Sequence, residues 1–132
     1  MIPQISQAPG VVQLVLNFLQ VLEQQGFTGD TATSYADRLT MATDNSVYQL
    51  LPDAILFPRS TADVALLARL AAEERFKTLI FTPRGGGTGT NGQALNAGII
   101  VDMSRYMNRI IEINPEEGWV RVEAGVIKDQ LN

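Results

Sequence analysis

The chain has 132 residues, of which 45% are hydrophobic and 18% are charged, a composition typical of one globular domain and not of a disordered or fibrous protein. It contains no cysteine and no histidine, which excludes disulfides, thiolate metal sites and histidine general bases within it. The formal net charge of −4 argues against nucleic-acid binding, which needs a basic face.

An amphipathic helix is predicted for residues 9–25, because apolar side chains recur there at helical spacing and Gly26 supplies a C-terminal stop. The apolar stripe consists of Val11, Leu14, Val15, Phe18 and Leu22. Polar residues interrupt the run and nothing basic precedes Arg38, so it fits neither a membrane span nor a secretory signal. We therefore expect a cytoplasmic protein with no membrane span.

The next stretch, residues 28–51, is rich in Thr, Ser, Asp and Asn and carries only a weak pattern. A short helix over residues 35–41 is the one element that we predict in it. Together with the preceding helix, this makes residues 1–51 an N-terminal helical segment. It is distinct from residues 52–132, where the pattern becomes sharper.

A strand–helix–strand unit is predicted at the start of this second region. Residues 54–57 form a short apolar run closed by Pro58, as in a buried strand. Ser60 and Asp63 have the spacing of a capping box, in which both side chains satisfy free amides at a helix start. A helix of about four turns leads to a second apolar run at residues 78–82, and its apolar face is predicted to consist of Val64, Leu67, Ala68 and Ala71. The two strands should be parallel, with a right-handed crossover.

Three further strands are predicted at residues 98–102, 109–114 and 119–123, the last two joined as an antiparallel hairpin by a turn from Asn114 to Gly118. Residues 126–132 resemble the opening of another helix. Because a natural domain seldom ends on an unfinished helix, we expect a fragment of a longer protein, truncated at its C-terminus. The predicted fold class is α+β, a βαβ unit plus an antiparallel hairpin.

A Gly-rich segment follows the second strand directly and holds five glycines in the eight positions from Gly85 to Gly92. Glycine avoids the cost of left-handed backbone geometry, which is about 1–2 kcal/mol for other residues. Successive N–H groups in such a turn form an anion site, and each hydrogen bond to a charged acceptor contributes roughly 1.5–3 kcal/mol. Three or four such bonds would hold a diphosphate without a lysine. The alternative is a flexible Gly-rich loop that binds nothing.

Two common nucleotide-binding loops do not fit this segment. A Walker A loop requires Gly-Lys-Ser/Thr, and no lysine lies between Lys77 and Lys128. The run from Gly87 to Gly92 matches G-x-G-x-x-G, but a Rossmann loop must open a helix, and residues 93–97 leave no room for one before the next strand. The sequence therefore argues against NAD(P) binding.

Four motifs in one order carry a resemblance to a known family: residues 58–64 (PRSTADV), 83–89 (PRGGGTG), 100–105 (IVDMSR) and 122–126 (VEAGV). Together they resemble the FAD-linked oxidases of the vanillyl-alcohol oxidase and p-cresol methylhydroxylase type, over residues 52–132. More narrowly, the chain is similar to the bacterial 2-hydroxy-acid dehydrogenases of this family, including large members with an iron-sulfur region far downstream. The resemblance implies the first subdomain of a two-subdomain FAD-binding domain.

The resemblance also implies which residues hold the cofactor, because the matching loop of the family donates backbone amides to the FAD pyrophosphate. The implied cofactor-binding residues are Arg84, Gly85, Gly86, Gly87, Thr88, Gly89, Asn91 and Gly92. Some relatives link FAD covalently through a histidine in this loop, where this chain has Thr88, so binding should be noncovalent. None of the family's catalytic residues or metal ligands is expected within the chain.

The implied activity of the full-length protein is oxidation of a D-2-hydroxy acid by hydride transfer to FAD, with electrons leaving to a downstream acceptor, while the chain alone should be inactive. The expected partners are FAD and a small 2-hydroxy acid. Two alternatives stay open. One is a noncatalytic phosphate- or nucleotide-binding module, and the other is a truncated folding unit that self-associates through exposed apolar surface.

Overall fold

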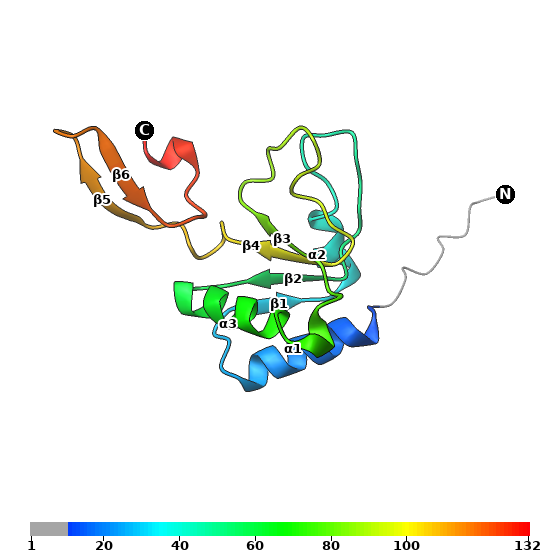
Figure 1. Ribbon diagram of the computed structural model, residues 1–132. Coiled ribbons are helices and arrows are strands. Elements are labelled where there is room, and N and C mark those ends of the chain that lie inside the picture. Colours follow the sequence, from blue (N-terminus) through cyan, green and yellow to red (C-terminus); the bar gives the residue numbers. More distant parts are fainter. Residues whose placement is uncertain (1–10) are drawn as a thin grey trace.

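The computed structural model describes residues 11–132 and contains a four-stranded sheet with helices packed on it and a separate two-stranded hairpin (Figure 1). This arrangement confirms the predicted α+β class, while the predicted helix start at residues 9 and 10 lies outside the described residues. In chain order the elements are α1 (Gln13–Gln24), β1 (Asp30–Ala32), α2 (Tyr35–Thr40), β2 (Ala54–Phe57), α3 (Thr61–Ala71), the 3₁₀ turn η1 (Glu74–Phe76), β3 (Phe81–Arg84), β4 (Ile99–Asp102), β5 (Ile110–Asn114), β6 (Trp119–Val122) and the 3₁₀ turn η2 (Lys128–Gln130).

The four-stranded sheet has the order β1-β2-β4-β3, with β2, β4 and β3 parallel and β1 antiparallel at one edge. The parallel relation predicted for β2 and β3 is confirmed, but β4 lies between them. The sequence pattern misses β1, because three residues are too few to show a period of two. The carboxyl ends of β2, β4 and β3 therefore share one edge of the sheet.

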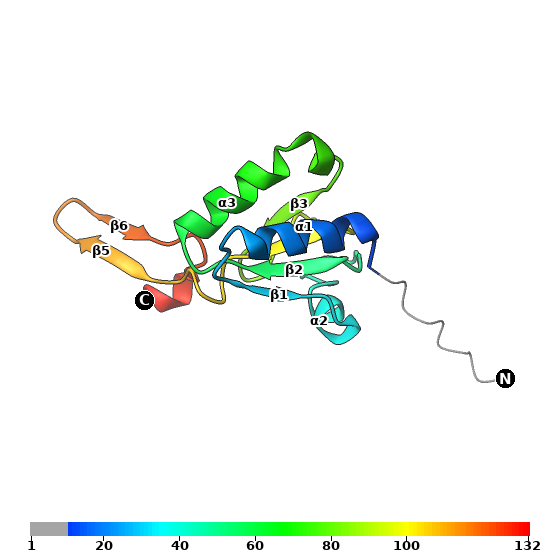
Figure 2. The same ribbon diagram turned by 90° about the horizontal axis from the view of Figure 1, so that it is seen from below.

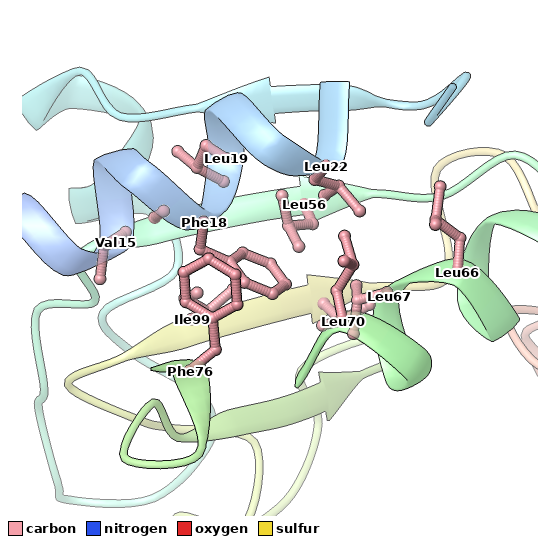
Figure 3. Packing of buried hydrophobic residues seen from close by; sticks show 12 residues of the cluster. Val15, Phe18, Leu19, Leu22, Leu56, Leu66, Leu67, Leu70, Phe76 and Ile99 are labelled. Carbon is pink, nitrogen blue, oxygen red and sulfur yellow. The ribbon is translucent and has the colours of Figure 1, made fainter. Parts of the chain in front are cut away.

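Helices α1 and α3 cover one face of this sheet, and α2 lies on the other (Figure 2). On the first face, Phe18 of α1 meets Phe76 edge to face, with the ring centroids 5.1 Å apart, beside the leucines of α3 (Figure 3). The second face is smaller and is formed by Ile55, Phe57 and Ile100. Because β2 and β4 are buried on both faces, they give a firm base to the loops at their carboxyl ends.

Glycines with positive φ end two of the predicted elements, the first helix and the hairpin turn. Gly26, at φ 96°, follows α1, which buries Val15, Phe18, Leu19 and Leu22. Gly118, at φ 72°, closes the hairpin turn, where its N–H donates to the Asn114 carbonyl oxygen at 2.9 Å. The predicted hairpin of β5 and β6 is thereby confirmed, with a β-bulge between Ile110 and Glu112.

The start of α3 keeps one half of the predicted capping box. The Ser60 hydroxyl accepts the Asp63 N–H at 3.2 Å, as expected. The Asp63 carboxylate instead accepts the N–H groups of Arg59 and Thr28, each at 2.9 Å, and the Thr28 hydroxyl at 2.7 Å. Burial opposes ionisation of Asp63, but these hydrogen bonds outweigh it and lower its pKa. The carboxylate therefore ties the segment before β1 to the start of α3.

The predicted apolar face of α3 is wrong by one residue along the helix. Because Asp63 is buried, the helix turns the residues that share its face toward the sheet. The buried residues beside it are Leu66, Leu67 and Leu70, whereas Ala68 is exposed. The helix is also shorter than expected, at 11 residues. Strand β3 begins at Phe81 and not at residue 78. The residues before it form the 3₁₀ turn η1 and a turn in which the Leu79 N–H donates to the Phe76 carbonyl oxygen at 2.9 Å.

Candidate functional site

The Gly-rich segment, residues 85–92, leaves the carboxyl end of β3, at the edge where β2 and β4 also end. Ligands of open α/β sheets bind outside the carboxyl ends of the strands. No helix occurs in residues 85–98, as predicted from the spacing that argued against a Rossmann loop. Gly85, Gly86 and Thr88 are exposed, so a ligand has access to the segment.

Free backbone donors distinguish this segment. None of the N–H groups of residues 85–90 donates to an acceptor within residues 11–132, and the Asn91 N–H donates to the Gln93 side chain at 3.1 Å. An added Cβ at Gly85 would meet nothing within 4 Å, and one at Gly86 would make only ordinary contacts, the shortest being 3.7 Å to Thr88. A run of unpaired donors therefore lies beside open space, which is what a bound anion requires.

Gly87 forms a bend whose positive φ favours glycine, and the Arg84 guanidinium lies against this bend. Gly87 has φ 67°, and an added Cβ would lie 2.8 Å from Cζ of Arg84. The Arg84 guanidinium donates to the Thr43 carbonyl oxygen at 2.8 Å and to the Met41 carbonyl oxygen at 3.5 Å. Arg84 therefore braces the bend against the segment before β2, with two of its N–H groups directed at protein.

Residues 41–50, where the sequence pattern is weakest, form a second side of the site. The Asn45 N–H donates to the Gly89 carbonyl oxygen at 3.1 Å. Gly92 has φ 75°, and an added Cβ there would approach the Tyr48 ring to 3.1 Å. An open pocket of about 350 Å³ lies between the two segments, lined by Tyr48, Gln49, Leu50, Asn91, Gly92 and Leu95.

Asp44 is the charged group on this second side. Its Oδ1 accepts the Ser46 N–H at 2.7 Å, and its Oδ2 is buried without a hydrogen-bond partner among residues 11–132. The hydrogen bond from Ser46 and, more weakly, the positive charge of Arg84 lower the pKa of Asp44 against the opposing effect of burial. An ionised Asp44 offsets part of the Arg84 charge, so attraction for an anion rests mainly on the backbone N–H groups.

A second cluster at the same edge was not visible in the sequence. The Tyr106 hydroxyl donates to the Asp30 carboxylate, 76 residues away, and Arg59 and Arg105 approach that carboxylate at 3.4 and 3.9 Å. Arg59 also lies over the Tyr106 ring, and Arg105 lies over Phe57. The Tyr106 hydrogen bond, followed by the two arginines and against some burial, lowers the pKa of Asp30. These groups satisfy one another, so the cluster fastens β1 to the turn after β4.

Residues 11–132 contain neither a metal-binding cluster nor a helix able to span a membrane. No three acidic side chains in that part of the chain gather closely enough to hold a metal ion. Its helices are also too short or too polar for any of them to cross a membrane.

The chain is similar along its whole length to D-2-hydroxyglutarate dehydrogenases. It is 91% identical over 132 residues to the enzyme of Escherichia coli (strain K12) and 79% identical to that of Pantoea ananatis (strain AJ13355). Each alignment covers 100% of this chain and 13% of the relative. The chain thus spans 13% of the length of these curated relatives and corresponds to their N-terminal part.

The fold is similar to that of a solved alkyldihydroxyacetonephosphate synthase, with a TM-score of 0.73 at 21% identity, over 88% of this chain and 26% of that chain. A family model described as "FAD binding domain" matches residues 52–132, which include β2 to β6 and the Gly-rich segment. The match extends over more than half of the chain. The chain therefore belongs to the FAD binding domain family.

Proposed function

We propose that the Gly-rich segment binds the pyrophosphate of FAD. The observation that carries this proposal is the run of unpaired N–H groups in residues 85–90, in a chain of the FAD binding domain family. The segment follows a strand at the carboxyl edge of the sheet, and its donors stand beside open space. Such donors suit two linked negative groups better than a single lysine would, because each N–H direction is fixed by the backbone.

The direct contacts in this proposal come from the main chain. The N–H groups of Gly85, Gly86, Gly87, Thr88 and Gly89 donate to the phosphate oxygens, and the exposed Thr88 adds a hydroxyl donor. Binding is noncovalent as far as this chain is concerned, because it holds neither histidine nor cysteine.

The remaining three residues have supporting roles. Arg84 is a positioning residue, since its guanidinium bonds to the carbonyl oxygens of residues 41 and 43 and holds the bend at Gly87. Asn91 and Gly92 lie at the mouth of the pocket beside Tyr48 and receive the part of the cofactor adjacent to the pyrophosphate. In this division residues 52–132 carry the main-chain contacts to the pyrophosphate, and residues 11–51 complete the sheet and core through β1 and α1 and the pocket through Tyr48.

We also propose that the full-length protein is an FAD-dependent dehydrogenase of a D-2-hydroxy acid, as the names of its relatives indicate. FAD, when bound, supplies the hydride acceptor. The part played by this chain is to bind and orient the cofactor, because substrate-binding groups and the iron-sulfur region implied by the family resemblance belong to the rest of the protein. Oxidation of D-2-hydroxyglutarate by the purified full-length protein, followed with a dye acceptor, tests this step.

The pyrophosphate site is tested with full-length protein carrying Gly85→Ala. The added methyl enters open space and Gly85 does not have positive φ, so the unfolding temperature should change by less than about 2 °C. The methyl nevertheless stands where the ligand would approach, and the Kd for FAD should rise about tenfold through loss of one hydrogen bond. Glu116→Ala, in the exposed hairpin turn, is the control and should bind FAD normally. A wild-type protein that is colourless and takes up no FAD would refute the proposal.

A further inference from the structure

Asn91 is followed by Gly92, a pair whose side-chain amide and backbone nitrogen react with each other in water. The Gly92 nitrogen attacks Cγ of Asn91, a new C–N bond forms, and the Nδ2 group leaves as ammonia with the proton of the Gly92 N–H. Water then opens the resulting succinimide ring on either side of its nitrogen, which leaves an aspartate or an isoaspartate at position 91. The net reaction consumes water and releases ammonia, and nothing is oxidised or reduced.

Both reacting groups of this pair are free. Neither the Gly92 N–H nor the Asn91 side chain has a hydrogen-bond partner among residues 11–132. Asn91 is exposed and lines the open pocket of about 350 Å³, so water reaches it. Gly92 has no side chain that shields its nitrogen. The nitrogen therefore attacks without first breaking a bond to the fold.

The other asparagines of residues 11–131 lack this freedom. For three of them the N–H of the next residue is already bonded, either within a helix or to a carboxylate: Asn17, Asn45 and Asn108. Asn96 is 7% exposed, and its side-chain amide donates to the Ile80 carbonyl oxygen at 3.0 Å. Asn114 precedes Pro115, whose nitrogen carries no proton. In this part of the chain, only Asn91 combines a free side chain with a free N–H on the next residue.

The products change the charge beside the proposed pyrophosphate site. Asn91 directly follows the unpaired N–H groups of residues 85–90, and its loop stands beside residues 41–50 (Figure 1). A carboxylate at position 91 repels a diphosphate and adds to the negative charge of Asp44 on the second side of the site. An isoaspartate also lengthens the main chain by a methylene group just before Gly92, where φ is 75°. Either product should therefore weaken FAD binding.

We propose that Asn91 is a site of spontaneous deamidation and that its deamidation weakens FAD binding. The reaction depends only on the free groups of Asn91 and Gly92, whereas its effect on FAD rests on the proposed function. Bound FAD covers the loop and slows the reaction. Protein without its cofactor thus loses the capacity to bind FAD with time.

The reaction is tested by incubating FAD-free full-length protein and following its peptides by mass spectrometry. The peptide that contains Asn91 should gain about 1 Da. Its rate should exceed that of the other asparagines of residues 11–131 by at least about fivefold, because hydrogen bonds or burial hold them or, at Asn114, the next residue lacks an N–H. The rate should be higher at pH 8 than at pH 6, because the attacking nitrogen loses its proton. Enzymatic methylation of isoaspartate identifies that product.

The effect on the cofactor is tested with Asn91→Asp and Asn91→Gln, which differ chiefly in charge. The Kd for FAD should be about tenfold higher for Asn91→Asp than for Asn91→Gln. Asn114→Asp makes the same change in charge at the end of β5 and should bind FAD as the wild type does. Saturating FAD should slow the conversion of Asn91 in the wild-type protein by at least about fivefold.

Two results would overturn the proposal. In one, Asn91 stays intact while other asparagines of residues 11–131 convert, and in the other, Asn91→Asp and Asn91→Gln bind FAD equally well. If Asn91 converts first but at the same rate with and without bound FAD, the deamidation site stands and the proposed pyrophosphate site is wrong.

Discussion

Two neighbouring loops leave the same edge of the sheet and differ in how they use their backbone donors. After β4, the Asp102 Oδ1 accepts the Ser104 N–H and hydroxyl, each at 2.8 Å, and the Arg105 N–H at 3.1 Å, and the Met107 N–H donates to the Met103 carbonyl oxygen. After β3, the N–H groups of residues 85–90 have no acceptor in the part of the chain that the structure describes. Most N–H groups of the turn after β4 therefore have an acceptor within the protein, whereas those of residues 85–90 in the loop after β3 have none among residues 11–132.

Under the proposed function, this difference distinguishes a structural loop from a ligand-binding loop without reference to composition. Buried or crowded N–H groups without a partner cost roughly 1–3 kcal/mol each, so a fold tolerates a run of them only where solvent or a ligand supplies acceptors. The two loops should therefore respond oppositely to mutation. Changes after β3 should act on FAD binding, and changes after β4 should act on stability.

The largest effect is expected from Gly87→Ala in the full-length protein. Positive φ would strain an alanine here, and the new Cβ, 2.8 Å from Cζ of Arg84, would displace the guanidinium that braces the bend, so several donors should lose their direction. We expect the Kd for FAD, measured by fluorescence titration, to rise about a hundredfold. Gly118→Ala is the matched control, with a similar φ but open space and no ligand nearby, and it should cost about 1 kcal/mol of stability without changing the Kd. Equal Kd values for the two variants would show that the bend at Gly87 has no special role in FAD binding.

Asp102→Ala should produce the next largest effect, and on stability alone. Asp102 is only 5% exposed, so removing its carboxylate leaves three donors without an acceptor in a buried position, and the free energy of unfolding should fall by about 2 kcal/mol. Denaturant titration measures this loss. Asp102→Asn keeps the Oδ1 acceptor and should recover most of it. If Asp102→Ala weakened FAD binding by the folded protein more than Gly87→Ala does, the assignment of the two loops would be reversed.

Arg84→Lys should have a smaller effect on the β3 loop. The lysine keeps the charge but loses the planar fork that reaches the Thr43 and Met41 carbonyl oxygens together. We expect the Kd for FAD to rise about fivefold, through a less ordered bend, with a change of less than about 1 kcal/mol in stability. Arg121→Lys, on the exposed hairpin, is the control. A hundredfold rise in the Kd would instead mean that Arg84 contacts the pyrophosphate directly.

The smallest expected effect is on how stability depends on pH, through the Asp30 carboxylate that Tyr106 contacts after β4. The Tyr106 hydrogen bond and the nearby arginines lower the pKa of Asp30 in the folded protein. The ionised carboxylate therefore adds stability above its unfolded pKa of about 4, and this contribution is lost as the pH falls through the lower folded value. Unfolding curves at pH 7 and pH 3 should show a smaller acid loss for Tyr106→Phe than for the wild type. An equal loss would mean that the hydrogen bond from Tyr106 to Asp30 does not contribute to the pH dependence of stability.

Local patterns predicted the elements that one short segment determines alone. The stripe of α1, the apolar run of β2 and the turn ending at Gly118 were all readable because spacing and a single glycine or proline decide them. The buried face of α3 was not, because Asp63 is drawn inward by Thr28, a residue that only the fold brings near. β1 was missed for a similar reason, since its pairing with β2 and not its own composition makes it a strand.

The candidate site likewise has one part that the sequence predicted and one part that it did not. Glycine density and position after a strand predicted residues 85–92 as an anion loop, a prediction that still awaits a ligand. The second side of the site, residues 41–50, carries no periodic signal and reaches the loop through the Asn45 to Gly89 hydrogen bond and the bonds of Arg84. The brace on Gly87 could therefore be found only from coordinates.

Hydrogen exchange of the full-length protein with and without FAD tests the central claim most directly, because it reports on the backbone N–H groups themselves. Saturating FAD should slow exchange at residues 85–89 by about tenfold or more and leave Met103, Ser104, Arg105 and Met107, whose amides already have partners, unchanged. If FAD binds and residues 85–89 exchange as fast as before, those N–H groups do not hold the pyrophosphate and the account is wrong.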